Sequence, residues 1–156
     1  MKVYVEKLKD GKGLWFELPV NQNEVFRRLA LSEGDEYEIS DYESSVNFKI
    51  PLVNNLNQMN RFAEGLEEMP RILKNNGREI IENCYNDVND FMENWKELKI
   101  VPDIGNNAEL GNWVVESRGD KVPESLEYYI DYAAIGRDFR INAFVFYVDG
   151  SAIIKY

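Results

Sequence analysis

Hydrophobic and polar positions alternate at the start of the chain, and this period of two predicts β-strands. Residues 2–8 alternate in this way, and a second apolar segment follows at 14–18. The turn sequence DGKG at 10–13 lies between them, so we expect an antiparallel hairpin. Asn21 or Asn23 is suited to cap a short helix after the hairpin.

A third strand is expected at 36–42, where polar and less polar positions alternate again. Tyr37 and Ile39 share one side of it, with Asp41 as a further candidate for that side. The hairpin, the short helix and this strand together predict a small α+β unit.

The spacing of apolar residues changes to three and four in the middle of the chain, which is typical of helices. One helix is expected to begin after Asn54-Asn55 and to end before Pro70. A short helical piece at 71–74 follows, and Asn75-Asn76-Gly77 is expected to break it. The longest helical pattern then runs from 78 to 98, which predicts a helical bundle for the middle of the chain.

Two further helices are expected in the last third. Asn106-Asn107 is suited to cap the first. Pro123 fits the first position of the second, and Gly136 can adopt the left-handed conformation that ends a helix, so a helix of about three turns is expected between them. The apolar side of this helix, which we expect to be buried, consists of Leu126, Tyr129, Ile130 and Ala133.

The chain ends in two apolar segments, 141–148 and 152–156, and Asp149-Gly150 between them predicts a hairpin. The pattern as a whole predicts an elongated α+β protein built from three small units. These are an α+β unit with an antiparallel sheet at 1–50, a helical unit at 51–105, and a helix with a β-hairpin at 106–156.

Composition excludes several classes of function. The hydrophobic content of 44% is ample for a core, and the net charge of −10 opposes direct binding to nucleic acid or to anionic membranes. Histidine is absent, which removes the commonest general base and the commonest metal ligand. Cys84 is the single cysteine, so no intramolecular disulfide forms, and its setting in a predicted helix favours a small buried hydrophobe.

No catalytic residue, metal ion or cofactor is expected. Asp87, Asp90 and Glu93 are spaced so that they could surround a cation, but they lack the pattern of a calcium-binding loop. A hydrolase that uses a pair of carboxylates remains open on the residues alone. The N-terminus lacks a signal-peptide core, and no apolar segment approaches the ~20 residues needed to cross a bilayer, so a cytoplasmic location is expected.

Negative charge is concentrated in three segments. The net charge is −6 over 33–43, −5 over 79–97 and −5 over 103–131. Such segregation is compatible with ordinary solvation and with a functional acidic surface, and it would attract a basic partner.

Four sequence motifs carry a resemblance to a known family. YIDYAAIGRDF at 129–139, preceded by ELGNWVVE at 109–116, resembles the antirestriction motif of the ArdA family of DNA-mimic proteins, which are found on conjugative elements and plasmids. WFELPV at 15–20 and EYEISDYE at 36–43 are similar to the first domain of the same family. The resemblance therefore extends, in order, over nearly the whole chain.

This resemblance implies a non-enzymatic homodimer that occupies the DNA-binding groove formed by the specificity and methyltransferase subunits of type I restriction–modification enzymes. A cofactor, direct binding to nucleic acid and binding to a membrane are not implied. An acidic adaptor for another basic partner, without DNA geometry, is the alternative.

Two sets of residues are the candidates for these roles. The acidic surface is expected to comprise Asp35, Glu36, Glu38, Asp41, Glu43, Glu79, Glu82, Asp87, Asp90, Glu93, Glu97, Glu109, Glu116, Asp120, Glu124, Glu127 and Asp131. The motif and the candidate dimer contacts comprise Leu126, Tyr128, Tyr129, Ile130, Asp131, Tyr132, Ala134, Gly136, Arg137 and Asp138.

Charge density sets a requirement for mimicry. Duplex DNA carries one charge per ~1.7 Å of axis, or one per ~3.4 Å along each strand. A helix over 79–97 would span ~27 Å at ~1.5 Å per residue and carry six acids, or one per ~5 Å. Several acidic elements, doubled by a dimer, are therefore needed.

Overall fold

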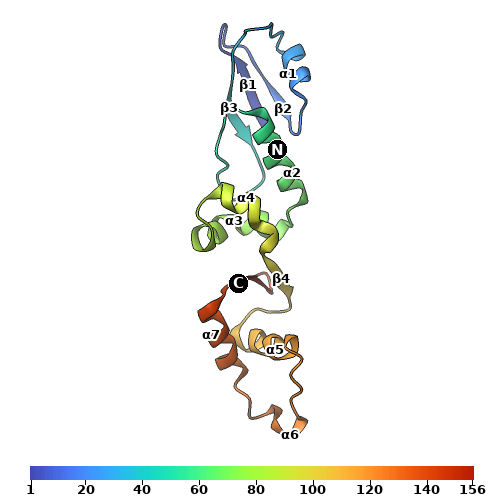
Figure 1. Cartoon of the computed structure of the whole chain (residues 1–156), viewed down its shortest axis with the longest axis vertical. Helices are drawn as coiled ribbons and strands as arrows, with labels where there is room; N and C mark the ends of the chain where they lie inside the picture. Colours follow the sequence, from blue (N-terminus) through green and yellow to red (C-terminus); the bar gives the residue numbers. More distant parts are fainter. The chain divides into compact units, whose positions relative to one another are not determined.

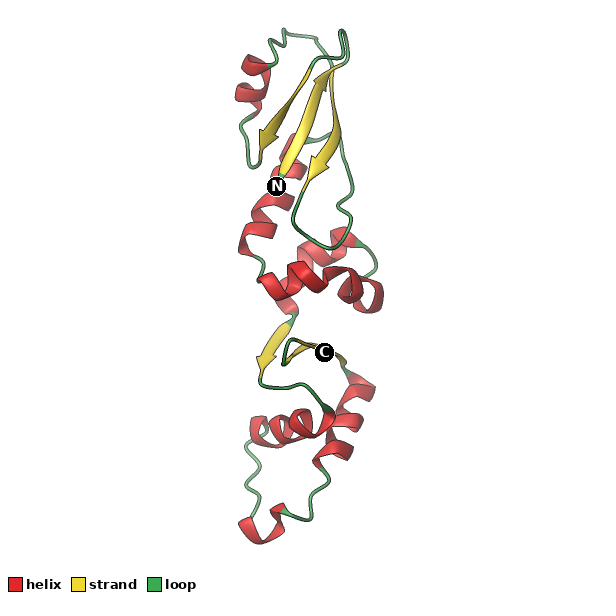
Figure 2. Ribbon diagram, turned by 180° about the vertical axis from the view of Figure 1, so that it is seen from behind, coloured by secondary structure: helices red, strands yellow, loops and turns green.

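The computed structural model describes residues 1–156, which divide into two compact units, Met1–Met92 and Glu93–Tyr156 (Figure 1). The α+β class is confirmed: a three-stranded antiparallel sheet comes first, helices follow, and helices with a second three-stranded sheet end the chain (Figure 2). The expected division into three units, with boundaries at residues 50 and 105, stays a prediction.

The N-terminal sheet has the strand order β2-β1-β3 and is antiparallel throughout. Its strands are β1 (Lys2–Lys7), β2 (Gly13–Glu17) and β3 (Tyr37–Glu43), which confirms the expected hairpin and third strand. Val3, Val5 and Phe16 are fully buried on its inner face. Helix α1 (Gln22–Arg28) follows the hairpin and is capped by the side chain of Asn21.

A β-bulge changes the alternation that the sequence predicted for β3. Ile39 lies opposite Val5 and Asp41 lies opposite Tyr4, so Ser40 is an extra residue in β3. After the bulge Asp41 is exposed, and the expectation that it shares the side of Ile39 is wrong.

Helix α2 (Leu56–Glu68) confirms the first predicted helix of the middle region. The Asn55 side chain accepts a hydrogen bond from the backbone N–H of Gln58 at 3.1 Å and caps its first turn. Its apolar stripe is buried as expected and consists of Leu56, Met59, Phe62, Ala63 and Leu66.

The predicted break at Asn75-Asn76-Gly77 is wrong, because α3 (Arg71–Cys84) runs through it without interruption. Gly77 is buried against the ring of Phe48, where a Cβ atom would collide with the ring carbons. The glycine therefore permits close packing of a continuous helix. Asn76 is accommodated because its side-chain amide donates to the carbonyl of Ile72 at 2.8 Å.

The chain instead breaks after Cys84, so the single helix predicted for 78–98 is also wrong. Tyr85 is extended, and the Asp87 carboxylate accepts the backbone N–H of Asp90 at 2.9 Å, which starts α4 (Val88–Asn94). A 3₁₀ turn, η1 (Trp95–Glu97), follows. Cys84 is half-buried, and its thiol donates to the carbonyl of Ile80.

The second unit contains a sheet of order β4-β6-β5, made of β4 (Lys99–Pro102), β5 (Phe144–Val148) and β6 (Ser151–Lys155). The predicted terminal hairpin is confirmed, and Asp149 and Gly150 both have the positive φ that its tight turn requires. The core beneath it consists of Val101, Ile104, Leu110, Val145, Ala152 and Ile154. No helix in the chain is long and apolar enough to traverse a bilayer.

The helix predicted from Pro123 to Ile135 is divided in two, and this expectation is wrong. Only the single turn α6 (Glu124–Glu127) follows Pro123, and α7 (Tyr132–Asn142) begins after an N-cap at Asp131. Gly136 lies inside α7 rather than at a helix end. A Cβ atom there would collide with the carbonyl oxygen of Asn107 in α5 (Asn107–Ser117), so the glycine is required by helix packing.

Candidate acidic interaction surface

The carboxylates of this chain lie at its surface, and no charged residue is buried. Of the predicted acidic surface, Asp35 and Asp90 are half-buried, and the other members are exposed. Their groupings differ from those expected, because strand register and helix breaks decide which carboxylates become neighbours.

The outward face of the N-terminal sheet gathers acids from all three of its strands. Cross-strand partners place Lys2 between Glu17 and Glu43, Tyr4 between Trp15 and Asp41, and Glu6 between Gly13 and Glu38. Directly opposed residues share one face of a sheet. We call this surface, defined by Lys2, Tyr4, Glu6, Trp15, Glu17, Glu38, Asp41 and Glu43, the outer sheet face.

The outer sheet face is strongly negative. It carries five carboxylates and the one ammonium of Lys2, a net charge of −4, and the Lys2 ammonium lies 3.4 Å from a Glu17 oxygen. Strands of this length span ~20 Å, so the net charge of −4 corresponds to about one charge per ~5 Å along the strands. This net charge is sparser than the one charge per ~3.4 Å along a single DNA strand, so the outer sheet face needs further acidic elements beside it to imitate DNA.

Glu6 and Glu38 stand directly opposite each other in β1 and β3. Like charges in this position destabilise a sheet. A surface shaped only by stability would favour a lysine at one of the two positions. This pair therefore favours a role for the charge of this face beyond its contribution to stability.

Sequence reasoning missed Glu6 and Glu17 as members of this surface. The signal was present for Glu6, because it alternates with the buried Val3 and Val5 in β1. The same signal was present for Glu17, which lies between the buried Phe16 and Leu18, and its pairing with Lys2 places it on the same face of the sheet as Glu6.

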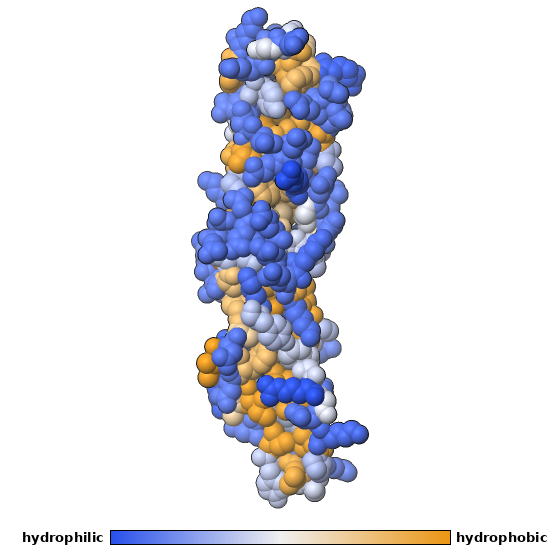
Figure 3. Space-filling view, viewed as in Figure 1, coloured by the Kyte–Doolittle hydropathy of each residue, from blue (hydrophilic) through white to orange (hydrophobic).

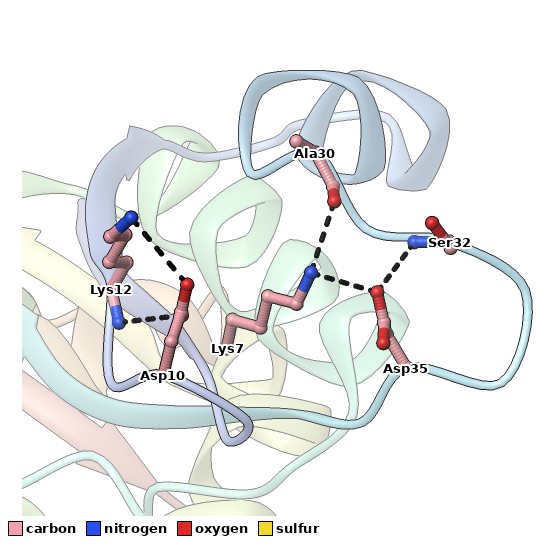
Figure 4. A network of polar contacts seen from close by, with 6 residues as sticks. All are labelled: Lys7, Asp10, Lys12, Ala30, Ser32 and Asp35. Atoms are coloured by element: carbon pink, nitrogen blue, oxygen red, sulfur yellow. Dashed lines mark hydrogen bonds and ion pairs between the residues drawn. The ribbon is translucent and has the colours of Figure 1, made fainter.

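Asp35 lies in the loop that joins α1 to β3, residues 29–36, which we call the α1–β3 loop (Figure 4). Its Oδ2 atom lies 2.9 Å from the Lys7 ammonium and accepts the backbone N–H of Ser32 at 2.8 Å. The Lys7 ammonium and the Ser32 N–H favour the ionised carboxylate, and together they lower the pKa of Asp35 below its ordinary value.

The acids predicted for one long central helix do not form one row. Glu79 and Glu82 are exposed on α3, where Arg78 pairs with Glu82 at 3.1 Å. Asp87 belongs to the turn before α4 and Asp90 to the first turn of α4, where Asp90 accepts hydrogen bonds from Asn86. The remaining two of the set, Glu93 and Glu97, belong to the second unit.

The second unit has an open hollow of about 450 Å³ with carboxylates at its rim. Asp103, Glu109 and Glu116 line it, together with the aromatic side chains of Trp113 and Tyr132. The backbone N–H of Gly105 donates to Glu109 at 2.6 Å and the Asn112 amide donates to Glu116 at 3.0 Å, so neutral groups orient two of these carboxylates.

The segment around α6 exposes apolar and acidic side chains together. Leu126, Tyr128 and Tyr129 are 52%, 93% and 84% exposed, so the expectation that Leu126 and Tyr129 are buried within the chain is wrong. Hydrophobic residues also reach the visible surface elsewhere in the second unit (Figure 3). The acids of this segment, all exposed, are Asp120, Glu124, Glu127 and Asp131.

The rest of the predicted motif builds α7 and its contact with α5. Asp131 accepts the backbone N–H of Ala134 at 2.9 Å, and Arg137 lies 3.8 Å from its carboxylate. Gly136 is buried, Ile130, Tyr132 and Ala134 are half-buried, and Asp138 is exposed.

Asn107 joins these elements at the first turn of α5. Its side-chain oxygen accepts the Tyr147 hydroxyl at 2.9 Å and an Arg140 N–H at 3.3 Å. Burial raises the pKa of the Tyr147 hydroxyl, and the hydroxyl acts as a hydrogen-bond donor here.

The exposed carboxylates are suited to contact with a basic partner. No group of three His, Cys, Asp or Glu side chains is placed to hold a metal ion. The fold and its surface define a small acidic α+β protein whose carboxylates lie at the surface on strands, helices and loops.

Comparison with known families agrees with the motifs. The family model described as antirestriction protein (ArdA) matches residues 10–153, and the chain belongs to this family. Antirestriction proteins of this family are non-enzymatic inhibitors. A comparison with curated proteins finds no match.

Proposed function

We propose that this chain inhibits type I restriction–modification enzymes by occupying their DNA-binding groove as a mimic of duplex DNA. Membership of the ArdA family supports the type I enzyme as the target. The outer sheet face carries the proposal for the mechanism, because it gathers five carboxylates from three strands on one side of the sheet and includes the opposed pair Glu6 and Glu38.

The proposed mechanism is competition for a basic groove. Lysine and arginine side chains that hold DNA phosphates would instead meet carboxylates of this protein. Attraction between the acidic surface and the groove raises the rate of encounter, and counterions are released from both surfaces on binding. Both contributions weaken as salt concentration rises.

The carboxylates proposed to face the enzyme are the exposed members of the predicted set, with Glu6 and Glu17 added to them. Each exposed charge contributes modestly, because surface ion pairs are typically worth under ~1 kcal/mol. Inhibition is therefore expected to depend on many acids acting together.

The proposal includes a homodimer that extends the acidic surface. The exposed rings of Tyr128 and Tyr129, with Leu126 beside them, form an apolar patch of the kind that contacts between subunits cover. The candidate contacts are the motif residues given above, and of these the same three side chains are exposed apolar ones.

Displacement of labelled DNA from a purified type I enzyme tests the proposal. The protein is titrated into the enzyme–DNA complex at two salt concentrations, without the nucleotide needed for cleavage. We expect stoichiometric release of the DNA, with weaker competition at the higher salt concentration.

Two other outcomes of this titration would contradict the proposal. Failure to release DNA at either salt concentration would refute the mimic. Binding of the protein to the enzyme without competition by DNA would instead support the acidic adaptor.

A further inference from the structure

The Lys7–Asp35 ion pair differs from the others in its burial. Its two side chains are 14% and 17% exposed, whereas the partners in the Lys2–Glu17 pair are 45% and 76% exposed. The same contrast holds on the neighbouring hairpin turn, where Lys12 is 83% exposed beside Asp10. Asp35 is therefore poorly placed to meet a partner's cation.

The Lys7 ammonium connects two points of the α1–β3 loop (Figure 4). It donates to the carbonyl of Ala30 at 3.2 Å and lies 2.9 Å from Asp35, which also holds the N–H of Ser32. The Leu8 N–H donates to the carbonyl of Glu36 at 3.1 Å. This backbone hydrogen bond is a third contact between the end of β1 and the loop.

The loop has a backbone that requires such restraint. Ala30 has φ +49° and Gly34 has φ +87°, and the left-handed conformation is rare for alanine. The loop carries Glu33 and Glu36, both exposed, immediately before the acids of β3. The position of these two carboxylates therefore depends on the contacts that hold the neighbouring backbone at Ala30, Asp35 and Glu36.

We propose that Lys7 and Asp35 are positioning residues for the acidic surface: their ion pair holds the α1–β3 loop so that Glu33 and Glu36 extend the carboxylates of β3. The inference rests on the proposed function. It assigns a supporting role to a lysine within an anionic interface and removes Asp35 from the charges that face the enzyme.

For Lys7→Met, a positioning role and the change of net charge predict opposite effects on binding to a basic groove. Lys7→Met changes the net charge from −10 to −11, so charge alone predicts equal or tighter binding to a basic groove. Loss of the Lys7 contacts predicts weaker binding, because the loop between Ala30 and Asp35, which carries Glu33, is then held only through the Leu8–Glu36 backbone contact at its end. Lys12→Met is the matched control, since it makes the same charge change at an exposed position of the same hairpin.

The experiment compares wild type, Lys7→Met, Lys12→Met and Lys7→Arg in displacement of DNA from a type I enzyme. We expect Lys7→Met to compete about three- to tenfold more weakly, because two modest polar contacts of the loop are lost, while Lys12→Met should match or exceed wild type. Lys7→Arg, which keeps a cation at this position, should restore competition.

Two further measurements separate positioning from general loss of folding. Hydrogen exchange of the loop amides should accelerate in Lys7→Met, and the dependence of competition on salt should become shallower because fewer charges engage. A smaller folded fraction would lower the active concentration without changing that salt dependence. Asp35→Asn, which is isosteric, should reproduce the Lys7→Met result, and the double variant should be no worse than either single variant.

Wild type and the variants test two separate claims, the proposed function and the positioning role of Lys7 and Asp35. Failure of the wild-type protein to displace DNA refutes the proposed function. If wild type competes and Lys7→Met and Asp35→Asn compete equally well, the positioning role is refuted while the mimic stands.

Discussion

Asp35 and Asp131 carry charge on the predicted acidic surface, and both also hold the backbone in place. Asp35 binds Lys7 and the N–H of Ser32, and Asp131 caps α7 through the N–H of Ala134. Such groups lose structural contacts as well as charge when they are neutralised. Glu38 and Glu43 have no ion-pair partner in the structure and provide cleaner tests of charge.

The Asp35 contacts predict a dependence on acid pH. Because its pKa is lower in the folded protein than its ordinary value of 3.8, the stabilisation from these contacts is fully present above pH ~4 and is lost as pH falls through the lowered pKa. A carbon-13 NMR titration of the carboxyl group should give a pKa below 3.8 in wild type and a higher one in Lys7→Met. Identical titrations in the two proteins would show that the ion pair is absent in solution.

Glu38→Gln should change stability and inhibition in opposite directions. Removing one charge from the opposed pair Glu6 and Glu38 relieves repulsion, so the free energy of unfolding should rise by roughly 0.2–1 kcal/mol. Competition with DNA should weaken slightly, and further neutralisation at Glu6, Asp41 and Glu43 should weaken it cumulatively. Urea unfolding and DNA displacement measure the two effects, and a large loss of inhibition from Glu38→Gln alone would contradict the distributed surface.

At the scale of elements, the contact between α5 and α7 determines how the motif is built. Gly111 and Gly136 are both buried at this contact, and a Cβ atom on either would collide with backbone of the other helix. Asn107 then connects α5 to Arg140 of α7 and Tyr147 of β5. The motif glycine therefore acts through the packing of its helix.

Gly136→Ala should destabilise the second unit by about 3 kcal/mol, because overpacking against backbone forces the two helices apart. Gly105→Ala is the control, since a Cβ atom there meets only the Glu109 carboxylate at an ordinary 3.7 Å. Its effect should stay below about 1 kcal/mol. Equal unfolding midpoints in urea for Gly136→Ala and wild type would refute the close contact.

At the scale of the whole molecule, the proposed inhibitor depends on the sum of separate acidic areas. These are the outer sheet face, the exposed acids of α3, the hollow lined by α5, and the segment around α6. A dimer would double each of them. The central helix predicted from the sequence is divided, so this sum replaces a single long row of carboxylates.

The double variant Tyr128→Ser/Tyr129→Ser tests the dimer. Both rings are almost fully exposed, so the stability of each chain should change little, while the molecular mass in solution should fall toward that of a monomer. Sedimentation equilibrium measures the mass, and DNA displacement should weaken with it. A wild-type protein that sediments as a monomer at the concentrations where it inhibits would rule the dimer out.

Local patterns were sufficient for much of the fold. Capping asparagines at 21, 55 and 106 marked the starts of three helices, because a cap depends on hydrogen bonds within one turn. Asp149-Gly150 identified the terminal hairpin for the same reason. The acidic character of the candidate surface also followed from the sequence.

Tertiary structure alone decided whether a glycine ends a helix or permits close packing, and which acidic residues become neighbours. A glycine lacks a Cβ atom whether it ends a helix or admits a neighbouring backbone, so Gly77 and Gly136 could be interpreted only with Phe48 and Asn107 in place. Glu6 and Glu38 are far apart in sequence and become neighbours through strand register, including a bulge that no local pattern specifies. Sequence determined how much charge the protein carries, and long-range packing decided where that charge lies.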